Sequence, residues 1–281
     1  MAGEIAVKIE NLSFTYSGGE KPALNKINLE IKRGEYLGIM GLNGAGKTTL
    51  GLSINGIVPQ STMGIYEGSV IVEGLDTATT PVREMARTVG IVFDNPEFQM
   101  SQVSAAEEVA LGLENLGVPN EEMPPRVGAA LGTVGLAGFE ERSPMGLSGG
   151  QQQRLAIASV LAMQPKILFM DEPTSNLDPI GKEEVFELAR KLNREEGMTV
   201  IVAEHEAEVL AAYADRIVVL HQGEIVMIGT PSEVFSRGAE LAKIGLRVPQ
   251  ATELALSLAA AGAKDLPVTT DQAVTWLEAR S

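Results

Sequence analysis

A glycine-rich segment near residue 45 has the residue types that bind phosphate. Residues 41–48 fit the pattern GxxxxGK[ST], in which a lysine and a hydroxyl residue directly follow the last glycine. Glycines let backbone N–H groups turn toward phosphate oxygens, and the positive end of a following helix adds attraction. Lys47 is expected to reach the β- and γ-phosphates of a nucleotide, and Thr48 to hold Mg²⁺ through its hydroxyl. The expected nucleotide-binding residues here are Gly41, Leu42, Asn43, Gly44, Ala45, Gly46, Lys47, Thr48 and Thr49.

Two acidic residues, Asp171 and Glu172, follow the apolar segment 167–170. Such a run is typical of a strand buried in a parallel sheet. Asp171, at the carboxyl end of the strand, can face a metal beside the phosphate loop. Glu172 is then placed to polarise a water that attacks the γ-phosphate. An Asp-Glu pair after a strand is common by itself, so this interpretation depends on its pairing with the lysine segment.

Residues 147–151, LSGGQ, form a second candidate anion cradle. A serine and two glycines at a helix start bring backbone N–H groups and the helix dipole together. A plain helix cap is the alternative, since a helix start needs only one such residue. The position of the segment shortly before the acidic strand end favours the cradle. The expected nucleotide-binding residues here are Ser148, Gly149, Gly150 and Gln151.

The composition excludes several classes of protein. Lys+Arg 22 against Asp+Glu 37 gives a net charge of −15, and an acidic surface argues against a nucleic-acid partner. The absence of cysteine excludes disulfides and thiolate metal ligands. No apolar run approaches the roughly 18 residues of a spanning helix, and the N-terminus lacks the pattern of a signal peptide. We expect a cytoplasmic protein that can still dock on a membrane protein.

Apolar periodicity predicts a mixed fold. Strands are expected at 5–10, 27–31, 36–40, 70–72, 91–93, 167–170, 199–203, 217–220 and 225–228, the last two as a hairpin. Helices are expected at 48–57, 104–116, 150–163, 181–196, 254–263 and 271–280. Because strands and helices alternate through the middle, the core is expected to be α/β with a parallel sheet. Ser104 and Glu107 predict a capping box, and residues 117–126 a proline-rich loop.

The three motifs together resemble the ATP-binding cassette of ABC transporters. LSGGQ stands downstream of GLNGAGKT and just upstream of ILFMDE, and the resemblance covers residues 5–235. It implies an α/β P-loop NTPase fold with a parallel core sheet, an antiparallel β subdomain, a helical signature subdomain and a small helical C-terminal tail. We expect the ATPase domain at 1–236 and the tail, which carries no catalytic motif, at 237–281.

The resemblance gives roles to further residues. Tyr16 resembles the aromatic residue that stacks on adenine, and His205 the switch histidine that contacts the γ-phosphate. Residues 175–178, SNLD, resemble the D-loop, which crosses to a partner cassette. Taken alone, Tyr16 is equally well a strand residue and His205 a residue at a helix N-terminus. The expected catalytic residues are Glu172 and His205.

Short segments resemble the ATPases of energy-coupling-factor importers, which take up vitamins and transition-metal ions. They are NGIVP at 55–59, NPEFQ at 95–99 and GLRVPQ at 245–250. One position departs from the family, which has glutamine where this chain has Asp94. A carboxylate there is attracted by Mg²⁺ and repelled by the γ-phosphate. The expected metal ligands are Thr48, Asp171 and Asp94, and a solvated loop aspartate is the alternative for Asp94.

The resemblance also implies partners. ATP and Mg²⁺ are expected between residues 41–48 of one cassette and 148–151 of a second ABC ATPase subunit, the same or a homologous chain. Hydrolysis is expected to drive a transmembrane coupling subunit and a substrate-binding membrane subunit from the cytoplasmic face of the cell membrane. Helix 104–116 is expected to relay the motion, and Val109 and Leu113, which share one face of it, are either docking surface or core. The alternatives are the ATPase of another ABC importer or exporter, or a soluble ABC ATPase.

Overall fold

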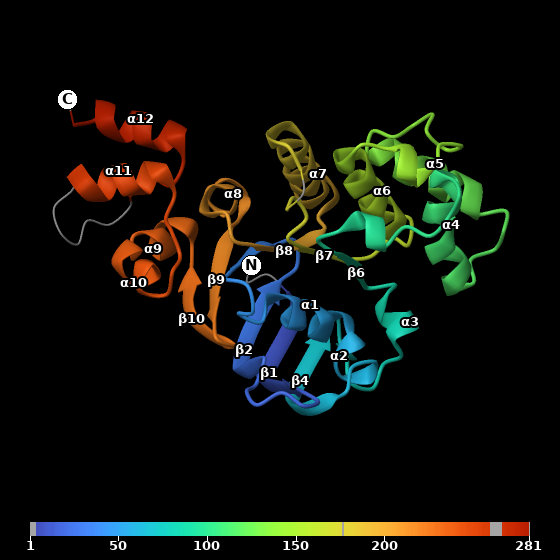
Figure 1. Ribbon diagram of the computed structural model, residues 1–281, viewed down its shortest axis with the longest axis horizontal. Coiled ribbons are helices and arrows are strands. Elements are labelled where there is room, and N and C mark those ends of the chain that lie inside the picture. The colour runs from blue at the N-terminus through green and yellow to red at the C-terminus, as the bar shows by residue number, and fades with distance from the viewer. Residues whose placement is uncertain (1–3, 176, 259–265, 281) are drawn as a thin grey trace.

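The computed structural model describes residues 4–175, 177–258 and 266–280, and it contains two β-sheets surrounded by helices (Figure 1). The smaller sheet is antiparallel and has the strand order β2-β1-β4-β5. Its strands are β1 (Ile5–Tyr16), β2 (Leu24–Lys32), β4 (Gly64–Val72) and β5 (Leu75–Asp76). Along β2, buried Ile27, Leu29 and Ile31 alternate with exposed polar residues, so one face of this sheet is covered.

The larger sheet has six strands in the order β10-β9-β3-β8-β7-β6. Its strands are β3 (Tyr36–Met40), β6 (Val89–Val92), β7 (Ile167–Asp171), β8 (Thr199–Glu204), β9 (Arg216–His221) and β10 (Glu224–Gly229). All pairs are parallel except the expected hairpin of β9 and β10. Every residue of β3, β7 and β8 is buried, as in a sheet covered on both faces. The segments that follow these three adjacent strands therefore meet at one edge.

Helices form three groups around the sheets (Figure 1). The group that follows β3 and β5 consists of α1 (Lys47–Asn55), α2 (Ile57–Gln60) and α3 (Val82–Met85). The helical lobe consists of α4 (Ala105–Leu116), α5 (Met123–Thr133) and α6 (Gly149–Leu161), which contact one another. Next to this lobe are α7 (Pro179–Glu196) and α8 (Ala207–Tyr213). The C-terminal group consists of α9 (Pro231–Phe235), α10 (Gly238–Lys243), α11 (Gln250–Leu258) and α12 (Thr270–Glu278).

Close packing of α1 on the sheet fixes the distance between the glycine-rich segment and the acidic strand end. Gly51 lies against the ring of Phe169 in β7, and a Cβ at this position would come within 2.4 Å of that ring. Phe169 is 1% exposed and belongs to the same hydrophobic cluster as Leu50 and Ile54. Any larger residue at position 51 would push α1 away from β7.

Several expected boundaries were wrong. The strand expected at 5–10 extends to Tyr16 in β1, and the strand expected at 70–72 already begins at Gly64 in β4. The proline-rich segment 117–126 is not all loop, because α5 begins at Met123 and its prolines lie in the first turn, where a missing N–H costs nothing. Helix α1 ends at Asn55, because Gly56 adopts the left-handed conformation, with φ 85°. The last expected strand residue at 93 lies outside β6.

Packing of α4 settles one alternative. Val109 and Leu113 are fully buried in the cluster of the helical lobe, so they are core and not docking surface. Ser104 caps α4 as expected and accepts the N–H of Glu107. Glu107 was expected to complete a capping box. It is instead the carboxylate of Glu108 that bonds to the chain before α4, where it accepts the N–H groups of Ser101 and Gln102 at 2.8 and 2.9 Å.

The C-terminal helices pack on the cassette through an apolar cluster. Leu241, Leu246 and Val268 lie in the same cluster as Met40 and Phe235. The expected tail helix at 254–263 begins earlier, since α11 starts at Gln250, and its expected residues 259–263 lie outside the described residues. Among the helices that the structure describes, none combines the length and the apolar character needed to cross a membrane.

Candidate functional site

The glycine-rich segment forms a loop between β3 and α1. Gly46, at φ 109°, ends this loop, and a Cβ there would come within 2.6 Å of the Ala23 carbonyl oxygen. It precedes α1 without a side-chain cap, so the first-turn N–H groups of this helix are free of that competition for an anion. The loop lines a cavity of about 550 Å³ together with Tyr16, Ala23, Phe93, Asp94, Asp171 and Glu172.

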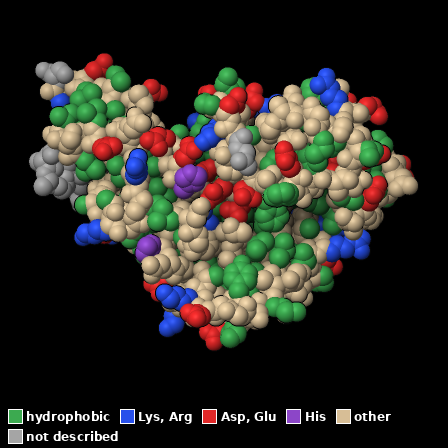
Figure 2. Space-filling model, viewed as in Figure 1, with side chains coloured by type: hydrophobic (Ala, Val, Ile, Leu, Met, Phe, Trp, Pro, Cys, Tyr) green, Lys and Arg blue, Asp and Glu red, His purple; other side chains and the backbone are tan. Residues whose placement is uncertain are grey.

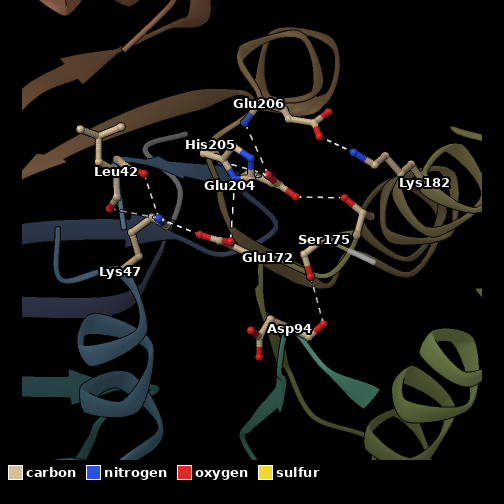
Figure 3. Close-up of polar contacts among 11 residues, drawn as sticks. Leu42, Lys47, Asp94, Glu172, Ser175, Lys182, Glu204, His205 and Glu206 are labelled. Atoms are coloured by element: carbon tan, nitrogen blue, oxygen red, sulfur yellow. Dashed lines mark hydrogen bonds and ion pairs between the residues drawn. The ribbon is translucent and has the colours of Figure 1, made fainter. Parts of the chain in front are cut away.

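Lys47 extends across the loop and contacts the acidic strand end (Figure 3). Its Nζ lies 2.8 Å from the Gly41 carbonyl oxygen and 2.9 Å from Oε1 of Glu172. Lys47 is 5% exposed and Glu172 20%. The pair therefore neutralises two charges that would be costly to bury singly. A phosphate that entered the cavity would compete with Glu172 for this ammonium group.

Three carboxylates face the same cavity. Burial raises the pKa of Asp171, and the charges of Glu172 and Asp94 raise it further, whereas a hydrogen bond with Thr48 and the charge of Lys47 act in the opposite direction. Figure 2 shows acidic side chains gathered at the middle of this face, beneath α7 and α8. A cation near Asp171 would relieve this repulsion.

Glu172 has a constrained backbone. Its φ is 45°, in the left-handed region that non-glycine residues rarely adopt. A hydrogen bond of 2.9 Å from its N–H to the Ala203 carbonyl oxygen in β8 holds this conformation. Oε2 of Glu172 lies 3.8 Å from Nδ1 of His205, which follows β8. Strain of this kind concentrates at functional sites.

Two further predicted residues border the cavity. The Tyr16 hydroxyl shares a hydrogen bond of 3.0 Å with Oγ1 of Thr49, so its ring stands beside the start of α1. Asp94 is exposed, and its carbonyl oxygen accepts a hydrogen bond of 3.2 Å from the Ser175 hydroxyl. This bond ties the segment after β6 to the segment after β7 (Figure 3).

The LSGGQ segment begins α6 and lies at a different cavity. Ser148 and Gln151 form a reciprocal capping box, with hydrogen bonds of 3.0 and 3.3 Å between each backbone and the opposite side chain. The plain-cap interpretation is therefore also true of this segment. Its residues line a cavity of about 410 Å³ with the start of α7, where the Asp178 side chain caps the helix through the N–H of Gly181. Asn176, in the predicted D-loop, lies outside the described residues.

Comparison with known proteins decides the family. The ABC transporter family matches residues 24–175. The energy-coupling factor transporter ATP-binding protein EcfA1 of Caldanaerobacter subterraneus subsp. tengcongensis is 44% identical over 265 residues, which cover 93% of each chain.

The chain belongs to the ABC transporter family. Among solved structures, cbiO1 from Clostridium perfringens, part of the ABC transporter complex cbiONQ, matches with a TM-score of 0.75 and 35% identity over 90% of this chain and 99% of that one. The ATP-binding cassette MJ0796, solved as a dimer in a post-hydrolysis state with ADP and Pi, matches with a TM-score of 0.69 and 34% identity over 80% of this chain and 98% of that one. The expected fold and the expected ABC ATPase are confirmed.

Within this ABC cassette, the structure brings the predicted residues together in two places. The glycine-rich loop, Tyr16, Asp94, Asp171 and Glu172 line one cavity, and the residues 148–151 line the other. His205 lies at the edge of the first, with its side chain half exposed.

Sequence reasoning missed the acidic residues on either side of His205 and their partners. Glu204, at the end of β8, and Thr174 share a buried hydrogen bond of 3.0 Å. Glu206 forms an ion pair with Lys182 of α7. The local signal was the order Glu-His-Glu after the segment 199–203, but this order does not indicate that the first of the two acids is buried.

Proposed function

We propose that this chain is the ATP-binding and ATP-hydrolysing subunit of an energy-coupling-factor importer of a vitamin or a metal ion. The observation that carries the proposal is the cavity in which Lys47 meets Asp171 and Glu172, on a cassette with EcfA1 and cbiO1 among its relatives. Phosphoryl transfer needs mainly positioning and charge stabilisation, and this cavity offers both.

Each side chain at the cavity has a proposed role. Lys47 binds the β- and γ-phosphates once it leaves Glu172, and the α1 N–H groups bind phosphate oxygens. Glu172, held by its strained backbone, positions the attacking water and accepts its proton. His205 contacts the γ-phosphate, and Tyr16 stacks on the adenine.

Thr48 and Asp171 fit the magnesium ion that the family implies. A hydroxyl and a carboxylate are hard oxygen ligands, and the pKa of Asp171, raised first by burial and then by the neighbouring acids, indicates a place for a cation. The described residues include no cluster of three His, Asp or Glu that could hold a metal, so phosphate oxygens and water would supply its other ligands. Bound there, the ion neutralises charge on the phosphates. Asp94 is proposed to contact it through water.

The proposed assembly contains two cassettes and a membrane complex. Because residues 41–48 and residues 148–151 line separate cavities in one chain, the second cradle is proposed to come from a partner cassette. The partner is the same or a homologous chain. A transmembrane coupling subunit and a substrate-binding subunit hold the pair at the cytoplasmic face of the membrane. We also propose residues 1–236 as the ATPase domain and 237–281 as an appended tail.

Expression of a tagged chain in its native host tests the proposal. Purification of a tagged chain from detergent-solubilised membranes should recover a polytopic subunit in fixed stoichiometry. The ATPase rate of that complex should depend on the transported vitamin or metal ion. Recovery of the chain only with soluble proteins, and a rate that ignores any transported substrate, would reject the importer.

A further inference from the structure

A buried carboxylate lies directly behind the proposed catalytic pair. Glu204 is the last residue of β8 and is 1% exposed. Its Oε1 accepts a hydrogen bond of 3.0 Å from the Thr174 hydroxyl, and its Oε2 accepts one of 2.9 Å from the N–H of His205 (Figure 3). The roles given above to the ATP site make no use of this group.

Two carboxylates lie near one nitrogen of the His205 imidazole. Its Nδ1 lies 3.6 Å from Oε2 of Glu204 and 3.8 Å from Oε2 of Glu172. Glu172 also faces Lys47, 2.9 Å from its other oxygen. Two cationic or proton-donating groups therefore face Glu172, one at each oxygen, and Glu204 offers the imidazole another acceptor at a similar distance.

Burial of a carboxylate at position 204 is unfavourable for the stability of the fold. Burial raises the pKa of Glu204, and hydrogen bonds from the backbone of His205 and from Thr174 offset this only in part. A neutral side chain of the same size would satisfy the same neighbours without the desolvation of a charge. The charged form of Glu204 therefore lowers the stability of the fold, which points to another use for the charge.

We propose that Glu204 is a positioning residue for ATP hydrolysis, which holds the His205 imidazole and Thr174 in place so that Glu172 remains available to the attacking water. The inference rests on the proposed function, because it assumes the roles given to His205 and Glu172. Thr174 leads directly into residues 175–178. The same carboxylate therefore links the switch histidine to the segment expected to reach the partner cassette.

Glu204→Gln isolates the charge. The amide oxygen can accept the His205 N–H while its NH₂ faces the Thr174 hydroxyl, so size and hydrogen bonds are kept. We expect kcat for ATP hydrolysis to fall about tenfold, at the low end of what losing an imidazole's orienting partner costs, with KM for ATP changed less than about twofold. The raised pKa means that the stability Glu204 contributes at low pH is lost as the pH rises through the folded-state value. At pH 7 and above, Tm should therefore not fall.

Two controls separate positioning from structure. Glu206→Gln changes the acid two residues after Glu204, whose ion pair with Lys182 is partly exposed, and should leave kcat unchanged. On a His205→Ala background, Glu204→Gln should lower kcat less than about twofold, because residues that act as a unit are not additive.

Each outcome decides the inference. A wild-type rate for Glu204→Gln, a fall in Tm along with the rate, an equal effect of Glu206→Gln, or full additivity with His205→Ala would overturn it. Glu172→Gln and His205→Ala measured beside these variants test the proposed site itself. If those two stay fast, the proposed roles fail; if they are slow and Glu204→Gln is fast, only the role of Glu204 fails.

Discussion

At the residue scale, the ion pair between Lys47 and Glu172 explains how nucleotide binding can activate the site. The two groups are 2.9 Å apart, so the ammonium that should bind phosphate and the carboxylate that should activate water neutralise each other. Binding of a γ-phosphate would draw Lys47 away and leave Glu172 as a free base. Both residues then gain their proposed roles in the same event, when the nucleotide arrives.

Glu172→Gln should bind ATP but hydrolyse it at least about 100-fold more slowly, because an amide cannot accept a proton from water. ATP-bound dimers should accumulate and elute at twice the monomer mass in size-exclusion chromatography with light scattering. Lys47→Ala is the matched control, since it should lose ATP binding and stay monomeric. A Glu172→Gln variant that remains a monomer in ATP and hydrolyses at the wild-type rate would show that the base was assigned wrongly.

Asp94→Asn should raise the Mg²⁺ concentration needed for half-maximal ATPase. The negative charge of Asp94 raises the pKa of Asp171, so it acts at the proposed magnesium site. Asp94→Gln should keep activity, since the family has glutamine at this position. Glu97→Gln, on an exposed acid of the same segment that does not line the cavity of Lys47, should not shift the titration. An unchanged Mg²⁺ requirement in Asp94→Asn would leave Asp94 as a solvated loop residue.

At the element scale, the sequence predicted best where local pattern and chemistry agree. β3 was predicted to the residue and β7 to within one, because fully apolar runs of this length are typical of strands buried on both faces. The start of α5 was missed because prolines read as loop signals, although they are tolerated in a first helical turn. Glu204 was missed because nothing local says that an acid at a strand end is buried beneath a histidine; that follows only from the pairing of β8 between β3 and β7.

Val109→Ala should lower the free energy of unfolding by about 2 kcal/mol, since this fully buried side chain of α4 would leave a cavity. Chemical denaturation of the isolated chain measures this. Phe98→Ala, on an 88% exposed ring in the segment before α4, should leave stability within about 0.5 kcal/mol. Helix α4 is expected to relay motion to the membrane subunit, and the exposed Phe98 ring lies shortly before it. Phe98→Ala should therefore weaken the transport-dependent ATPase rate instead. A fully stable Val109→Ala variant would contradict the core position of α4.

At the scale of the whole molecule, the positions of the two anion cradles determine how two chains must combine to complete an ATP site. The cavity of Lys47 and the cavity of Ser148 share no lining residue among those the structure describes. In a symmetric dimer the interface is formed twice, so each chain can give its glycine-rich loop to one site and its LSGGQ segment to the other. ATP would then be both substrate and part of the interface.

Mixing two inactive variants tests this arrangement directly. Lys47→Ala removes the phosphate lysine, and Ser148→Arg blocks the other cradle with a bulky side chain, so each variant alone should be inactive. In an equimolar mixture, half of all random encounters bring the two variants together, and one of the two sites of such a pair combines an intact Lys47 with an intact Ser148. The mixture should regain about a quarter of the wild-type ATPase rate if the two sites act independently. A mixture that stays as inactive as its components, although both variants are folded, would contradict completion of the site between two copies of this chain.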